Sequence, residues 1–262
     1  METDLVLLEI AKKDLEATKI LFNNKLYAQA IFYLQQCIEK AIKSLGIKRK
    51  IITESELKKE IGHKALKVFS KSYNQFRNKM ATLDFIEVGG KKYPLNKVAI
   101  EKLPKAFPSE EMESKVSFSR EELLNIISKI TREKDLLNKF IEDMKGVLYQ
   151  LLDTLHEIVP IEEKEAKREA NKRQIDAFVN EWNEVYSKLF SCHSTLFYLY
   201  LVFSPHSESS RYPRKDFNPL EIYNDKMPLI EQLSSYIKIT DETLDDLEHI
   251  YTHKKLTSFW AG

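Results

Sequence analysis

Glycine and proline are scarce in this chain, whose 262 residues contain six glycines and eight prolines. Because these two residues interrupt helices most strongly, their scarcity predicts long helices and an all-α fold. The length corresponds to one large or two small domains. A hydrophobic content of 43% and a charged content of 31% are typical of a well-packed protein rather than a disordered one.

Cysteines and long apolar runs are also missing. Cys37 and Cys192 both lie in apolar stretches with helical spacing, where a free cysteine behaves as a small hydrophobic side chain, so we expect no disulfide framework. The richest apolar stretch, 196–203, has eight residues and is too short to cross a bilayer. The first residues are acidic where a signal peptide would be basic. We therefore expect a cytoplasmic protein.

Several catalytic and cofactor motifs are absent from the sequence. The six histidines lack the paired spacing of metal ligands; His249 and His253 are four apart, but no glutamate follows His249 as in a metalloprotease. There is no glycine-rich phosphate loop and no serine in a nucleophile elbow. The sequence therefore predicts neither a metal site nor a cofactor.

Charge is unevenly distributed although the net charge is +1. Residues 43–79 contain eleven Lys or Arg against three Glu, whereas residues 216–248 contain nine Asp or Glu against two Lys. The basic segment either faces a polyanion or pairs with the acidic segment of the same chain. The composition alone favours neither alternative.

The helices are predicted from apolar residues spaced three and four apart, most clearly at 27, 31, 34, 38, 41 and 45. A first helix starts at Thr3 as its cap, and a second ends at Gly46. Ser119 and Glu122 form a capping box. The remaining predicted elements are a helix that starts near 55 or 62 and runs to 83, a loop-rich segment over 84–118 with a small β-hairpin, a long helix over 119–159, a charged helix start over 161–174, a helix from 175 to 203, and a last helix from 225 to 251.

Five residues are candidates for binding phosphate or a base. His63 follows a glycine near the start of the third helix, and Lys64 and Lys67 follow it; a helix N-terminus with lysines attracts phosphate. Arg211 offers a planar donor for phosphate oxygens, and Tyr212 offers a ring for base stacking. Alternatively, His63 caps or packs its helix and Arg211 pairs with the acidic C-terminal helix.

Four segments together resemble the HEPN family of small helical bundles, named for nucleotide-binding members in higher eukaryotes and prokaryotes. They are AKKDLEA at 11–17, YAQAIFYLQQCIEKAIK at 27–43, Gly-His-x-x-Leu at 62–66, and Ser-Arg-Tyr-Pro at 210–213. The Gln-Gln-x-x-Glu-Lys-Ala element is the most specific of them. The resemblance implies an antiparallel up-down helical bundle.

The order of these segments implies an interrupted domain. Residues 1–83 and 175–254 would form the HEPN-like bundle, and residues 84–174 would be an inserted helical segment. Family members are usually little more than a hundred residues long, whereas here 148 positions separate His63 from Arg211.

The resemblance also implies a function: binding of nucleotides or RNA, in a defence or toxin–antitoxin context, by a homodimer. The ribonuclease branch of the family carries Arg followed four to six residues later by His, and no arginine here has such a histidine. A non-catalytic binder is therefore expected. The alternatives are a metal-independent endoribonuclease that uses His63 and Arg211, and a helical interaction module that partners a nucleotidyltransferase.

Overall fold

The protein is almost entirely helical. A computed structural model describes residues 2–82, 85–88, 91–94, 118–156, 164–182, 185, 187–213 and 217–252. Within these ranges the strands form one two-stranded sheet and all other regular elements are helices, which confirms the all-α prediction with its small hairpin. Most of the loop-rich segment that the sequence predicts over 84–118 lies outside the described residues.

The first two helices form an antiparallel hairpin whose facing sides are apolar. Helix α1 spans Thr3–Asn23 and α2 spans Tyr27–Lys48, and the turn between them is short. Their facing sides bury the residues of the predicted stripes, including Leu8, Ala11, Leu15, Ile31, Leu34, Ile38 and Ala41. Burying such a stripe against a partner helix is what stabilises an amphipathic helix in water.

Two predicted helix ends are wrong, each for a local reason. Helix α2 does not stop at Gly46 but continues to Lys48. A Cβ atom at Gly46 would lie 2.8 Å from Cγ1 of Val68, so the glycine permits close packing rather than ending the helix. Thr3 does not cap α1 either: Glu2 holds the cap position, and the Thr3 hydroxyl donates a hydrogen bond to Glu54 instead.

The third predicted helix is divided at Gly62. A short helical segment, α3 (Glu54–Glu56) continued by the π-helical η1 (Leu57–Ile61), starts with a capping box formed by Thr53 and Glu56. Gly62 then adopts φ +46°, which a residue with a side chain rarely adopts. Helix α4 follows from Leu66 to Thr82.

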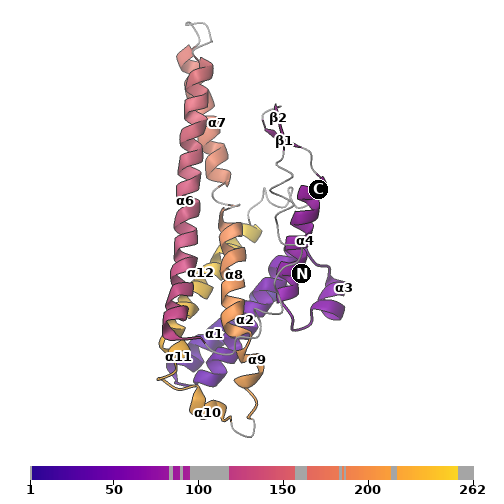
Figure 1. Cartoon of the computed structure of the whole chain (residues 1–262), viewed down its shortest axis with the longest axis vertical. Coiled ribbons are helices and arrows are strands. Elements are labelled where there is room, and N and C mark those ends of the chain that lie inside the picture. Colours follow the sequence, from indigo (N-terminus) through magenta and orange to yellow (C-terminus); the bar gives the residue numbers. More distant parts are fainter. Residues whose placement is uncertain are drawn as a thin grey trace.

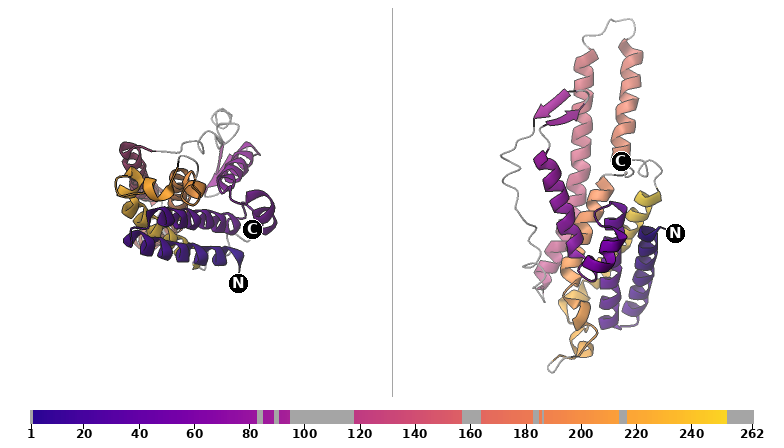
Figure 2. Two further views of the ribbon diagram at one scale, coloured as in Figure 1. Left: turned by 90° about the horizontal axis from the view of Figure 1, so that it is seen from below. Right: turned by 90° about the vertical axis from the view of Figure 1, so that its right-hand side faces the viewer.

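Two elements extend away from the rest of the molecule (Figures 1 and 2). Helix α6 spans Arg120–His156 and packs beside α7, which spans Lys164–Trp182. The predicted capping box starts α6: the Ser119 amide donates to the Glu122 carboxylate, and the Glu122 amide donates to the Ser119 hydroxyl. Strands β1 (Phe85–Val88) and β2 (Lys91–Pro94) pair in antiparallel register.

The C-terminal helices pack on the α1–α2 hairpin. They are α8 (Lys188–Phe203), α9 (His206–Ser209), α10 (Pro219–Ile222), α11 (Pro228–Glu231) and α12 (Leu233–Thr252). Helix α12 contacts α8 and α1, and α8 contacts α2, so the segments on either side of α6 and α7 share one core (Figure 1). The start of α6 joins it, because the buried Tyr236 hydroxyl donates to the carbonyl of Leu123 at 3.0 Å. The division into a bundle and an insertion at 84–174 stays a prediction.

The acidic C-terminal segment does form ion pairs, but with lysines outside the basic segment 43–79. Lys12 lies 2.6 Å from Glu248, and Lys19 lies 2.8 Å from Asp241. These pairs join α12 to α1. Pairing with the acidic segment therefore does not account for the basic one. Among the described residues, no helix combines the length and apolarity that a membrane span requires.

Candidate functional site

One face of α2 carries the polar residues of the Gln-Gln-x-x-Glu-Lys element. Phe32, Gln35, Gln36, Glu39 and Lys43 are spaced three and four residues apart, which places them along one side of a helix. Gln36 donates to Gln35 at 2.7 Å, and Gln35 donates to Glu39 at 3.1 Å. Gln35 and Glu39 are each 2% exposed. These buried polar groups are connected to one another, as buried polar groups must be to avoid a desolvation cost.

Glu39 connects this buried face to an exposed histidine. The Glu39 carboxylate lies 3.2 Å from Nδ1 of His63 and also accepts from Lys43. The His63 side chain is 89% exposed, whereas that of Glu39 is 3% exposed. A neutral imidazole that donates from Nδ1 to a carboxylate keeps its other nitrogen as an acceptor. Glu39 therefore fixes the orientation of an imidazole that a ligand can reach.

The neighbouring Lys40 points to a different partner. Its ammonium lies 2.6 Å from the Asp14 carboxylate on α1. The pair is largely shielded, since the Lys40 and Asp14 side chains are 24% and 14% exposed. Two adjacent residues of the motif thus have separate roles: Lys40 joins α2 to α1, and Glu39 holds His63.

The second candidate group lies two helical turns away on the same face of α2. The guanidinium of Arg211 stacks on the ring of Phe32 with 4.6 Å between Cζ and the ring centroid, and on Tyr212 at 4.9 Å. Phe32 and Glu39 are seven positions apart, roughly 10 Å along the helix axis. The structure therefore places Arg211 and His63 on one face of α2. No item of contact joins the two side chains within the described residues.

A buried histidine anchors the turn that carries Arg211. Nδ1 of His206 lies 2.8 Å from the Tyr223 hydroxyl, and the Ser210 hydroxyl donates to the His206 carbonyl at 2.7 Å. Burial lowers the pKa of His206 to about 4, so its ring is neutral near pH 7. Arg211 itself donates from Nε to the Ser207 carbonyl at 3.1 Å. Arg211 is therefore held by its backbone turn, by Phe32 and by Tyr212, rather than by an acidic residue among those described.

The basic residues beside His63 are exposed. Gly62 and His63 form the turn between η1 and α4, and Lys64 and Lys67 follow it on the surface. Lys67 donates to the Glu60 carbonyl at 2.9 Å. Lys64 forms no ion pair with a residue in the described ranges. His63 therefore does not stand in a helix first turn as predicted, but in the turn just before α4.

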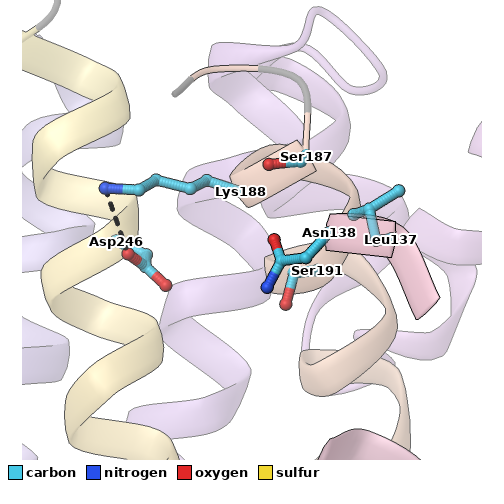
Figure 3. Close-up of a pocket in the computed structure, with 6 residues that line it drawn as sticks. All are labelled: Leu137, Asn138, Ser187, Lys188, Ser191 and Asp246. Carbon is cyan, nitrogen blue, oxygen red and sulfur yellow. Dashed lines mark ion pairs between the residues drawn. The ribbon is translucent and has the colours of Figure 1, made fainter. Parts of the chain in front are cut away.

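A small polar hollow lies elsewhere, between α6, α8 and α12 (Figure 3). It has a volume of about 140 Å³ and is lined by Leu137, Asn138, Ser187, Lys188, Ser191 and Asp246. Its cation is already paired, because Lys188 lies 3.6 Å from Asp246. No group of three or more His, Cys, Asp or Glu in the described part of the chain is placed to hold a metal ion.

We call the group formed by Phe32, Glu39, His63, Arg211 and Tyr212 the α2 site. The sequence singled out His63, Arg211 and Tyr212, and it missed the support of the first two by Glu39 and Phe32. The seven-residue spacing on α2 was the available signal. It did not suffice because nothing in the sequence shows which turn packs on which face.

Comparison with known proteins relates the first part of the chain to a family. Residues 5–84 match the family model described as HEPN domain. This range contains α1, α2, α3, η1 and α4, and therefore Glu39 and His63. It ends before Arg211. A search of curated proteins and a search of solved structures each found no match.

Proposed function

Because residues 5–84 are a HEPN domain, we propose that this protein binds nucleotides or RNA at the α2 site, without catalysis. The observation that carries the proposal is the placement of two exposed groups on one face of α2. They are Arg211, held over Phe32, and His63, held by the buried Glu39. They are separated by two helical turns, roughly 10 Å, which suits a ligand larger than a single phosphate.

The chemistry of the exposed groups fits phosphate and base together. Arg211 supplies a planar set of donors for phosphate oxygens, and Lys64 and Lys67 supply positive charge beside His63. The Tyr212 residue is 58% exposed, and an exposed ring is a stacking surface for a base. These are the contact types through which proteins hold single-stranded nucleic acid.

A salt titration tests this proposal. Binding of a fluorescent single-stranded RNA and of nucleoside triphosphates is measured by anisotropy or calorimetry from 50 to 300 mM salt. For single strands, log K falls with log salt by about 0.7 for each phosphate neutralised. Arg211→Ala and Lys64→Ala should each weaken binding and make the slope shallower by roughly 0.7. The matched controls are Arg132→Ala on α6 and Lys238→Ala on α12, both of which are exposed.

The outcomes separate the alternatives. Equal losses in the site variants and the controls would mean that binding is diffuse and does not use the α2 site. A flat salt response, or no binding at low salt, would overturn the proposal.

A second candidate is metal-independent RNA cleavage, and the contact between Glu39 and His63 favours it. A carboxylate that orients an imidazole is the arrangement of a general base and its positioning partner, and Arg211 would stabilise the charge on phosphorus. The test is cleavage of RNA in excess EDTA by wild type, His63→Ala and Arg211→Ala. The same background cleavage in all three would end this candidate.

The homodimer, the nucleotidyltransferase partner and the defence or toxin–antitoxin context rest on the family resemblance, and we keep them as parts of the proposal. Light scattering of the purified protein tests the dimer directly. A monomer over the concentration range used for RNA binding would remove it.

A further inference from the structure

A second and larger pocket lies among α4, α6 and α8. Its volume is about 640 Å³, within the range of small-molecule sites. The walls are mostly apolar and aromatic. The lining residues are Arg49, Phe69, Ser72, Tyr73, Phe76, Leu137, Leu189, Phe190, His193, Ser194 and Phe197. None of them belongs to the α2 site.

The inner wall of this pocket is rigidly packed. Phe69 is 3% exposed, and its ring meets His193 at 4.8 Å and Phe197 at 5.3 Å between centroids, both edge to face. Such aromatic pairs hold their geometry by packing and by the attraction of ring edge to ring face. The inner wall is therefore formed before any ligand arrives.

The rim of the pocket is apolar and accessible. Phe76 is 54% exposed and Phe190 is 61% exposed. Two large rings that border one concave surface form an apolar patch, and such patches mark binding sites more often than scattered single residues do. A ligand with an apolar body would remove both rings from water.

One end of the pocket carries positive charge. Arg49 is the charged residue among the described lining residues, and its Nη1 lies 3.3 Å from Nδ1 of His193. Burial, with Arg49 nearby, lowers the pKa of His193 to about 4, and burial lowers the pKa of Arg49. Near pH 7 the pair therefore has a single positive charge in surroundings of low polarity, where the attraction to an anion is stronger than in water.

We propose that this pocket binds a small amphipathic organic anion, with a carboxylate at Arg49 and an apolar chain against Phe69, Phe76, Phe190 and Phe197. Charge complementarity selects the head group, and the aromatic walls select the chain. This site goes beyond the nucleotide or RNA binding proposed above, and it requires nothing from the α2 site.

Ligands that share a chain and differ in head group test the proposal on the unmodified protein. Binding of decanoate, decanol and decyltrimethylammonium is measured by calorimetry and by displacement of anilinonaphthalene sulfonate fluorescence. Decanoate should bind saturably with one equivalent per chain. Decanol should bind at least tenfold more weakly, because a hydrogen bond to a charged group contributes about 1.5–3 kcal/mol, which corresponds to roughly 10- to 150-fold.

Substitutions locate the site. Phe76→Ser and Phe190→Ser should each weaken decanoate binding by about 5- to 30-fold, since each removes a ring that the chain covers. The matched control is Leu220→Ser, because Leu220 is 71% exposed and lies outside the pocket. Arg49→Gln should abolish the preference for decanoate over decanol while keeping decanol binding.

Three results would overturn the proposal: equal affinity for decanoate and decanol, no saturable decanoate binding, or the same effect of the rim variants and Leu220→Ser. If Arg49→Gln does not fold, the head-group comparison on wild type still decides the case. Loss of RNA binding in the α2-site variants with unchanged decanoate affinity would show that the two sites are independent.

Discussion

His63 and Glu39 form a pair in which an 89% exposed imidazole contacts a carboxylate that is 3% exposed. The contact of 3.2 Å joins the turn before α4 to the buried side of α2. Lys43 and Gln35 contact the same carboxylate. A reachable side chain is thus oriented by a group that solvent does not reach, and this gives the first prediction.

Replacing Glu39 by Gln should destabilise the fold. The substitution removes a buried charge and leaves Lys43 with a weaker partner, and losing a charged hydrogen-bond partner in a buried position costs about 1–3 kcal/mol. Urea unfolding measures the change. Glu16→Gln is the matched control, because Glu16 forms a salt bridge at 3.1 Å to Lys13 with both side chains at least 60% exposed. The control should change stability by less than about 0.5 kcal/mol. Equal effects would mean that burial of Glu39 is energetically unimportant.

Replacing Phe32 by Leu should weaken RNA binding without removing any charge. The ring supports the Arg211 guanidinium at 4.6 Å, and a cation–π contact at a partly exposed position contributes about 0.5–1 kcal/mol. We expect a two- to fivefold loss of affinity and an unchanged salt slope, whereas Arg211→Ala should change the slope as well. A change in slope for Phe32→Leu would argue against the supporting role of the ring.

Two glycines to alanine should act in opposite directions. At Gly46 a Cβ would meet Val68 at 2.8 Å and Ile52 at 3.1 Å, and overpacking of this kind costs about 1–3 kcal/mol. At Gly146, inside α6, nothing lies within 4 Å, so the better helix propensity of alanine should stabilise the protein by about 0.5–1 kcal/mol. Chemical denaturation of both variants checks the signs, and stabilisation by Gly46→Ala would contradict the packing argument.

Stability should decrease as the pH falls from about 6.5 towards 4. Burial lowers the pKa of both His193 and His206 from 6.5 to about 4, so in this range the unfolded chain binds protons that the folded chain does not. The free energy of unfolding is therefore fully maintained above pH 6.5 and decreases below it. Between pH 7.5 and 5.0 each histidine should account for about 2 kcal/mol.

Urea midpoints at the two pH values measure this loss. The decrease should be smaller in His193→Gln than in wild type, while His249→Gln, which changes an exposed residue of α12, should behave as wild type does. An identical pH dependence in all three proteins would show that neither ring is the source.

The sequence predicted the helices well because their signals are local. The apolar stripe of α2 and the Ser119–Glu122 capping box depend on residues a few positions apart, and both are confirmed. Gly46 was misjudged because its role depends on Val68, which approaches it only in the folded protein.

The same distinction explains what was missed at the α2 site. His63 and Arg211 were found from their motifs, but their supports, Glu39 and Phe32, lie 24 and 179 positions away in the chain. Contacts over such separations follow from how the helices pack, and no periodicity encodes them. The pocket around Arg49 and His193 was missed for the same reason, since those two residues are 144 positions apart.

The α6–α7 pair also has a mechanical consequence. Helix α6 has 37 residues, about 55 Å in length, and its first turn is fastened to α12 where Tyr236 meets Leu123. A tilt of about 10° at that end would displace the far end by about 10 Å. The helix therefore acts as a lever, and a change of side-chain packing too small to alter the core would be read at its far end as a movement the size of a helix diameter.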